Sequence, residues 1–187
     1  LAGLLMVIAW EVYLPRAAVT IQESDSGEMA AAAVLGGVLH PSGYPVYAEL
    51  SRWLVHLFPD NPFKTLAVLS ALLQGAAGAL LFLSCLGVSR NAAAAAAMAL
   101  AWLLYAPTVR SATDAEVFAL HHALMGAMVW QAIRLCQSQA AGPLRLFLLG
   151  LTCGLAGANH QTAVLWAPLA AAAFFSAASR SGGGRCW

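Results

Sequence analysis

Long apolar runs dominate this chain, and its few charged residues lie between or beside those runs. The runs cover residues 1–13, 66–86, 92–106, 117–136 and 144–176. Charged residues make up 9% of the 187 residues, against about 25% in an ordinary soluble domain. A chain with so few charges cannot cover its surface with polar groups, so we expect lipid to be part of its solvent.

These runs predict an all-α membrane protein, a polytopic bundle of about six transmembrane helices, because roughly 20 apolar residues cross the hydrocarbon core as a helix. The last run is too long for one helix, and the polar residues 159–162 interrupt it, so we expect two short spans joined by a turn. Within Pro45–Phe58, apolar residues three and four apart predict an amphipathic helix in the membrane interface. We assign residues 1–176 to this module and 177–187 to a polar, flexible tail.

The carboxylates show a second pattern. The predicted arrangement of membrane spans puts all eight of them on one side of the membrane. They lie in two polar interruptions or at the edges of apolar runs: Glu11, Glu23, Asp25, Glu28, Glu49, Asp60, Asp114 and Glu116. The opposite connections carry arginine and no acid, which places the acidic loops outside under the positive-inside rule. An acidic active site that faces one compartment would produce this distribution.

The first acidic loop contains the segment ESDSGE, in which Asp25 and Glu28 are three residues apart. This spacing puts both carboxylates on one face of a helix that we expect from Ser26 to about Leu39. Asp at the N-cap with Glu at the third helical position also fits a capping box, which satisfies free amides at a helix start. The two roles are compatible, because a capping carboxylate can still face a substrate.

The segment HPSGYPVY follows, and it predicts a rigid turn. Pro41 and Pro45 fix their own φ angles, while Gly43 can adopt conformations that other residues avoid. A turn of this kind could serve only to redirect the chain. His40 and Tyr44 nevertheless flank it, and they would offer an imidazole and a phenol beside the bilayer surface.

The second acidic loop places Arg110, Asp114 and Glu116 just before the run that begins at Val117. Thr113 with Glu116 again fits a capping box, so a purely structural role is an alternative here. Arg110 could pair with a phosphate group. The acids at 114 and 116, together with Asp25, are candidate ligands for a divalent metal.

The ordered motifs DSGE, HPxGYP, AEVFxL and NHxT give the chain a family resemblance from about Leu14 to Phe175. In this order they resemble the N-terminal membrane module of polytopic glycosyltransferases with the C-type (GT-C) fold, and most closely the protein O-mannosyltransferase branch. Two positions depart from the family pattern, with Ser42 in place of a second proline and His121 in place of an asparagine. Family members are longer, so we expect this chain to be a fragment.

The resemblance implies a polyprenyl-phosphate-linked sugar donor and an acceptor protein that approaches from the extracytoplasmic or lumenal side. Asp25 matches the catalytic carboxylate of the family, and Glu28 matches a second acid of the same motif. His40, Tyr44, Arg110, Glu116, Asn159 and His160 are then candidate substrate-binding residues. Some relatives place a divalent metal on the second acidic loop, whereas O-mannosyltransferases are not generally thought to need one, so no cofactor is assigned and metal use stays open.

The leading hypothesis is therefore a multi-pass glycosyltransferase of a bacterial inner membrane or the endoplasmic reticulum membrane. It would transfer a hexose, expected to be mannose, to Ser or Thr hydroxyls, with membrane lipid and no nucleic acid among its partners. The alternative is a transporter or lipid-binding protein, since acids in and beside membrane helices also line ion paths. Transporters place such acids near the bilayer midplane, in broken helices. The acids here cluster at one face, which favours the enzyme.

Overall fold

The computed structural model describes residues 1–22, 25–138 and 142–182. Every regular element in these ranges is a helix, as the sequence predicts. The α-helices are α1 (Ala2–Tyr13), α2 (Ser26–Leu35), α3 (Pro45–Leu57), α4 (Pro62–Ser89), α5 (Ala92–Leu103), α6 (Ala106–Thr113), α7 (Val117–Gln137), α8 (Pro143–Asn159) and α9 (Ala167–Gly182). Two 3₁₀ helices, η1 (Leu14–Arg16) and η2 (Gln161–Trp166), follow α1 and α8.

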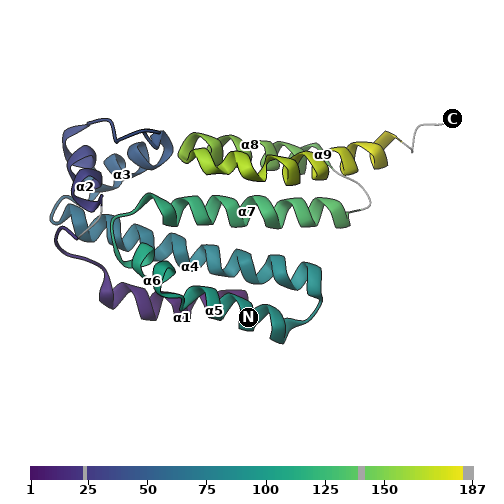
Figure 1. Cartoon of the computed structure of the whole chain (residues 1–187), viewed down its shortest axis with the longest axis horizontal. Coiled ribbons are helices and arrows are strands. Elements are labelled where there is room, and N and C mark those ends of the chain that lie inside the picture. Colours follow the sequence, from purple (N-terminus) through teal and green to yellow (C-terminus); the bar gives the residue numbers. More distant parts are fainter. Residues whose placement is uncertain (23–24, 139–141, 183–187) are drawn as a thin grey trace.

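The long helices form an elongated bundle around α4 and α7, which run side by side. Helices α1 and α5 cover α4 on one side, and α8 and α9 cover α7 on the other (Figure 1). We call these six helices the shaft. Small residues let its helices approach closely: a Cβ atom at Gly78 would lie 2.5 Å from Leu103 Cδ2, and one at Gly75 would lie 2.5 Å from Trp10 Nε1.

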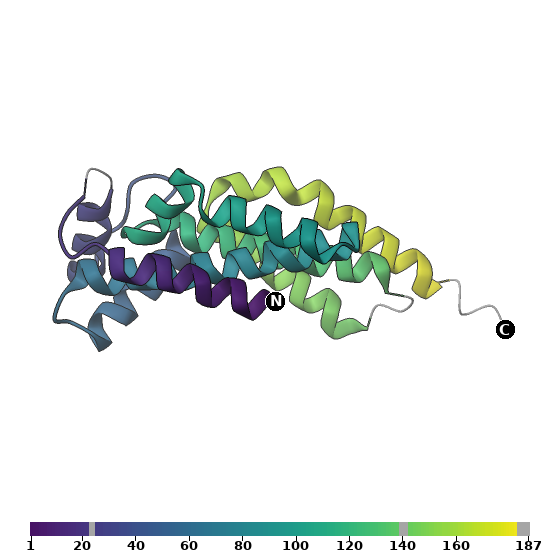
Figure 2. The ribbon, with the colours of Figure 1, turned by 90° about the horizontal axis from the view of Figure 1, so that it is seen from below.

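The short helices gather at one end of the shaft, which we call the site end and which comprises residues 14–22, 25–61, 104–116 and 159–166. Figures 1 and 2 show α2 and α3 at this end, beside α6 and the turn between α8 and α9. An apolar cluster from α2, α3 and the first turns of α4 and α7 holds these elements together; it includes Met29, Tyr47, Leu66 and Val117. Every described carboxylate lies at the site end or in the last turn of α1 beside it.

Most helices fall where the apolar runs predict them, but three local expectations are wrong. Helix α2 ends at Leu35 rather than near Leu39, because Gly36 adopts the left-handed conformation (φ 76°) and caps it. The second polar interruption, from Arg110 to Glu116, is not all loop, because α6 continues to Thr113. Thr113 does not cap α7, since it lies inside α6 with its hydroxyl donating to Val109 O at 3.0 Å, and Glu116 occupies the N-cap itself.

The last apolar run divides into two helices as predicted, with His160 and η2 between α8 and α9, so the polar residues 159–162 mark the end of α8 and the start of η2. The expected polar tail begins inside α9, which continues to Gly182, and residues 183–187 lie outside the described ranges. Among the described helices, α4 alone is long and apolar enough to cross a membrane by itself. Helices α5 and α6 pass the same test together, but a bend of 63° separates them. Six spans are therefore not confirmed, since α1, α5 and α8 are shorter than the roughly 20 residues that a span needs.

Candidate active site

The HPSGYP turn forms the centre of the site end. Gly43 (φ 84°) and Tyr44 (φ 42°) both adopt left-handed backbone conformations, and Pro45 opens α3 directly afterwards. Positive φ is free for glycine but uncommon for tyrosine, so packing must hold Tyr44 there. Its side chain is indeed buried. The predicted rigid turn thus positions two side chains, Tyr44 and His40, against the rest of the site.

Glu28 binds His40 through both carboxylate oxygens. Its Oε1 accepts the His40 backbone N–H at 2.6 Å, and its Oε2 lies 2.8 Å from His40 Nδ1. The hydrogen bonds from His40 hold the pKa of Glu28 below its ordinary value, and the same side-chain bond raises the pKa of His40. The expected capping box is not formed, because the Glu28 carboxylate is committed to His40 and Asp25 makes no side-chain capping bond.

The other ring nitrogen of His40 faces Tyr44 and Asp25. Nε2 lies 3.0 Å from the Tyr44 hydroxyl and 3.9 Å from Asp25 Oδ2. The Asp25 side chain is 58% exposed, so it is open to a substrate. Burial raises the pKa of Tyr44, and the nearby charges of Asp25, Glu28 and Glu116 raise it further. The second acidic loop lies close to the first, because Ala115 and Val117 pack in the same apolar cluster as Tyr44.

The turn between α8 and α9 closes the far side of this cluster. The His160 ring stacks on Tyr44, with ring centroids 5.5 Å apart and planes 15° from parallel. The Thr162 backbone N–H donates to His160 Nδ1 at 3.2 Å, and the Thr162 hydroxyl lies 3.0 Å from His121 Nε2. Burial lowers the pKa of His160. His160 therefore offers a neutral, aromatic wall to the cluster rather than a charge.

A separate polar pocket of about 360 Å³ lies beside the second acidic loop. Arg110 and Asp114 line it, together with Arg16 and Gln22 from the segment after α1. Asp114 is buried, and its Oδ1 accepts the Ala115 N–H at 2.7 Å. Two arginines that line one pocket suit an anion, since arginine pairs well with phosphate oxygens.

Of the three predicted metal ligands, only Asp25 belongs to a group of ligand atoms in the described part of the chain, and its partners there are not the predicted ones. Asp25, Glu28 and His40 each offer a ligand atom, and these atoms lie within 4.8 Å of one another, so the three residues could hold a divalent cation. Within the described ranges, Asp114 and Glu116 belong to no such group of three. His40 Nδ1 is already bonded to Glu28, so a cation would have to meet Nε2 and Asp25 on the other side of the ring.

Sequence reasoning found most of the cluster but not all of it. Asn159 is fully buried, and neither of its polar side-chain atoms has a hydrogen-bond partner among the described residues, so it lies beneath the site rather than at its surface. The structure adds five residues to the predicted candidates. Arg16 and Gln22 line the polar pocket, and Phe118, His121 and Thr162 lie beside His160 or bond to one another. No local motif marks Arg16, because its pocket joins segments that are far apart in sequence.

A helical bundle that gathers carboxylates, histidine, tyrosine and arginine at one end is suited to acid–base chemistry beside an anionic group. The family model for the protein O-mannosyl-transferase TMEM260 N-terminal domain matches residues 25–182, and the chain belongs to this family. The mouse protein O-mannosyl-transferase TMEM260 is 32% identical over 156 residues, which cover 82% of this chain and 22% of the mouse protein. The chain thus spans about a fifth of that relative's length, and no solved structure matches it.

Proposed function

We propose that this chain is the N-terminal part of a protein O-mannosyltransferase that transfers mannose from a polyprenyl-phosphate donor to Ser or Thr hydroxyls. Membership of the family supports the class of reaction. The observation that carries the assignment of the site is the cluster of Asp25, Glu28, His40 and Tyr44 beside a pocket lined by two arginines. A base and an anion site in one region are what transfer from a sugar phosphate requires.

In the proposed reaction Asp25 is the general base. Its carboxylate takes the proton of the acceptor hydroxyl as the acceptor oxygen forms a bond to C1 of the sugar. The bond between C1 and the donor phosphate oxygen breaks at the same time, which releases polyprenyl phosphate. Phosphate leaves readily without an added proton, so one carboxylate is enough. His40, held by Glu28, orients Asp25 and Tyr44 rather than reacting itself.

Arg110 and Arg16 are proposed to bind the donor phosphate in the pocket that they share. Both side chains are exposed, so a headgroup can reach them. Their positive charges would also stabilise the phosphate as negative charge develops on it during transfer. Glu116 is a further candidate for contact with the donor, because its neighbours Ala115 and Val117 pack in the same apolar cluster as Tyr44.

The experiment that tests the base is Asp25→Asn in the full-length protein. Transfer should fall by about a hundredfold or more, the scale of lost acid–base catalysis, because the amide cannot accept the proton. Folding should be unchanged, since Asp25 makes no capping bond. Glu11→Gln is the matched control, an exposed carboxylate in the last turn of α1 outside the cluster. Wild-type turnover of Asp25→Asn would exclude Asp25 as the base.

We further propose that the chain is a multi-pass membrane protein, in a bacterial inner membrane or the endoplasmic reticulum, with the site end on the extracytoplasmic or lumenal side. In a cysteine-free background, single cysteines at Ser42 and Ser111 should react with an impermeant thiol reagent from that side. A cysteine at Ser89, at the opposite end of the shaft, should not. Opposite accessibility of the first two positions would mean that α3 crosses the bilayer.

A divalent metal remains a testable addition to this proposal. Asp25, Asp114 and Glu116 are its candidate ligands from sequence, and the structure adds Glu28 and His40 to Asp25. If a metal takes part, chelator should abolish transfer and added manganese should restore it. Transfer that is insensitive to chelator would leave the carboxylates with the roles of base and orienting groups.

A further inference from the structure

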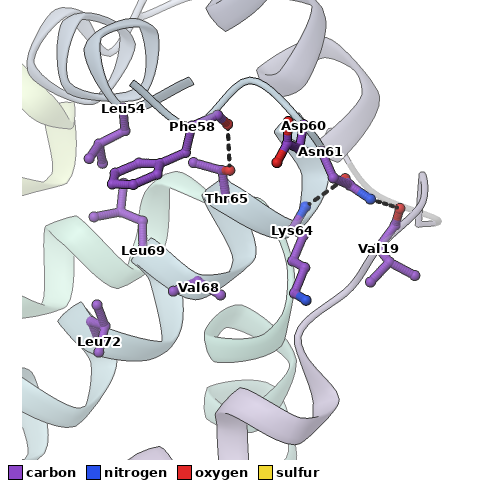
Figure 3. Close-up of a pocket in the computed structure, with 10 residues that line it drawn as sticks. All are labelled: Val19, Leu54, Phe58, Asp60, Asn61, Lys64, Thr65, Val68, Leu69 and Leu72. Atoms are coloured by element: carbon purple, nitrogen blue, oxygen red, sulfur yellow. Dashed lines mark hydrogen bonds between the residues drawn. The ribbon is translucent and has the colours of Figure 1, made fainter. Parts of the chain in front are cut away.

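An apolar groove of about 760 Å³ runs along the first turns of α4 and is separate from the candidate active site. Its floor is a single stripe of α4, spaced three and four residues apart from Asn61 to Leu72. Leu54 of α3 and Phe58, the residue after α3, form one wall, and Val19 lies at the mouth (Figure 3). None of the residues of the Asp25 cluster or the arginine pocket lines this groove.

The groove has the length of one lipid chain. From residue 61 to residue 72 the helix rises by about 16 Å, at 1.5 Å per residue. Half of the hydrocarbon core of a bilayer is about 15 Å thick. The deep end is close to α1, where Trp10 Nε1 donates to Leu72 O at 3.3 Å. An acyl chain that entered the groove at the site end would therefore reach Leu72 near the bilayer midplane.

Two opposite charges, Asp60 and Lys64, stand at the mouth of the groove (Figure 3). The uncharged polar side chains beside them are already used: Asn61 caps α4 through Lys64 N–H and donates to Val19 O, and Thr65 donates to Phe58 O. Among the ion pairs of the described residues, none joins Asp60 to Lys64. The mouth therefore offers one separate anion and one separate cation to a ligand.

We propose that this groove binds a zwitterionic phospholipid with a primary ammonium headgroup, namely phosphatidylethanolamine. Lys64 pairs with the lipid phosphate, Asp60 pairs with the ammonium group, and one acyl chain lies along the α4 stripe. An anionic lipid would satisfy Lys64 but would bring its uncompensated charge next to Asp60. This site requires the proposed membrane placement, but it does not depend on mannosyl transfer, so either proposal can fail without the other.

Native mass spectrometry of the full chain, released from detergent with defined lipids, tests the site. Wild type should retain phosphatidylethanolamine about two- to fivefold better than phosphatidylglycerol, the scale of one exposed ion pair. Asp60→Asn should abolish that preference without affecting the fold, since Asp60 is exposed. Equal or better retention of phosphatidylglycerol, or of a polyprenyl phosphate, by wild type would overturn the choice of lipid.

A second variant tests the groove itself. Val68→Trp should fill it and lower phosphatidylethanolamine retention about tenfold, the effect of excluding roughly two methylene groups. Val7→Trp is the matched control, an exposed position on α1 that lines none of the described pockets. Thermal melting monitored by circular dichroism checks that both variants fold. If folded Val68→Trp retains lipid as well as Val7→Trp does, the groove is not the binding site.

Discussion

The shaft and the site end of this molecule are built on different physical principles. In the shaft, α4 and α5 meet through glycine and alanine, and Gly78 leaves no room for a Cβ atom against Leu103. At the site end, side chains are polar and partly exposed, and Tyr44 is held in a backbone conformation that tyrosine rarely adopts. Close packing makes the shaft a rigid support. The site end instead carries polar side chains and a strained tyrosine backbone, neither of which contributes to stability through apolar burial.

Because the two regions differ in this way, we expect mutations in them to change different properties of the protein. Changes in the shaft should lower the free energy of unfolding and leave the chemistry of each folded molecule intact. Changes at the site end should lower binding or transfer and leave stability nearly unchanged. Proteins commonly keep strained or imperfectly packed residues at functional sites, because the surrounding structure can support them. The predictions below test this separation, in order of expected effect.

The largest effect in this series is expected at the arginine pocket of the site end. Arg110→Ala should weaken donor binding about 10- to 100-fold, because a hydrogen bond to a charged group contributes about 1.5–3 kcal/mol. Arg16→Ala should act in the same direction, since both residues line one pocket. Arg134→Ala, an exposed arginine near the opposite end of α7, is the control. Donor affinity measured by titration of the full-length protein should be normal in the control; loss there as well would indicate non-specific charge attraction.

Gly78→Ala tests the shaft. The new methyl would lie 2.5 Å from Leu103 Cδ2 and 2.8 Å from Cδ1 and Cγ, so the whole buried end of that side chain would have to shift. Overpacking costs about 1–3 kcal/mol, which outweighs the up to about 1 kcal/mol that alanine gains over glycine in a helix. Gly154→Ala on α8 meets no atom within 4 Å and should instead stabilise the protein. Chemical denaturation should show opposite signs for the two variants, and equal signs would contradict the close contact.

The shaft could be predicted from sequence far better than the site end. Apolar runs report helix positions directly, and the polar quartet at 159–162 located the α8–α9 break. The motifs also identified Asp25, Glu28, His40 and Tyr44, but not that Glu28 would bind His40 instead of capping α2. That pairing depends on how the HPSGYP turn folds back onto α2. The polar pocket that Arg16 and Arg110 both line joins segments that are distant in sequence, and no local pattern encodes it.

Helix caps give a smaller test of the same comparison. At the opposite end of the shaft, Asn91 caps α5 by accepting the Ala94 N–H at 3.0 Å. Asn91→Ala should therefore cost about 1 kcal/mol, the usual effect of removing a side-chain cap. Asp25 occupies the same position on α2 but makes no such bond, so Asp25→Ala should cost clearly less. Thermal melts of both variants measure the difference, and an equal loss would show that Asp25 is a structural cap.

The smallest expected effect is a pH dependence that only the site end should show. The pKa of His40 is raised above its ordinary 6.5, so its contribution to stability is complete below 6.5 and lost as pH rises through the raised value. The pKa of Glu28 is lowered below 4.5, so its contribution is present above 4.5 and lost as pH falls through the lowered value. Both contributions are complete between pH 4.5 and pH 6.5, so the Glu28–His40 pair should stabilise the turn most strongly in that range.

Glu28→Gln removes the charged partner and should lower the pKa of His40, because its largest upward influence is the side-chain bond to Glu28. NMR titration of ring-labelled histidine measures this pKa, with His40→Gln assigning the signal. Glu49→Gln is the matched control, since Glu49 binds Arg52 at 2.9 Å and lies three residues from it on α3. We expect the His40 pKa to fall in Glu28→Gln alone. An unchanged pKa would mean that Glu28 does not hold His40 in solution, and the site end would then lack the fixed geometry that distinguishes it from a flexible loop.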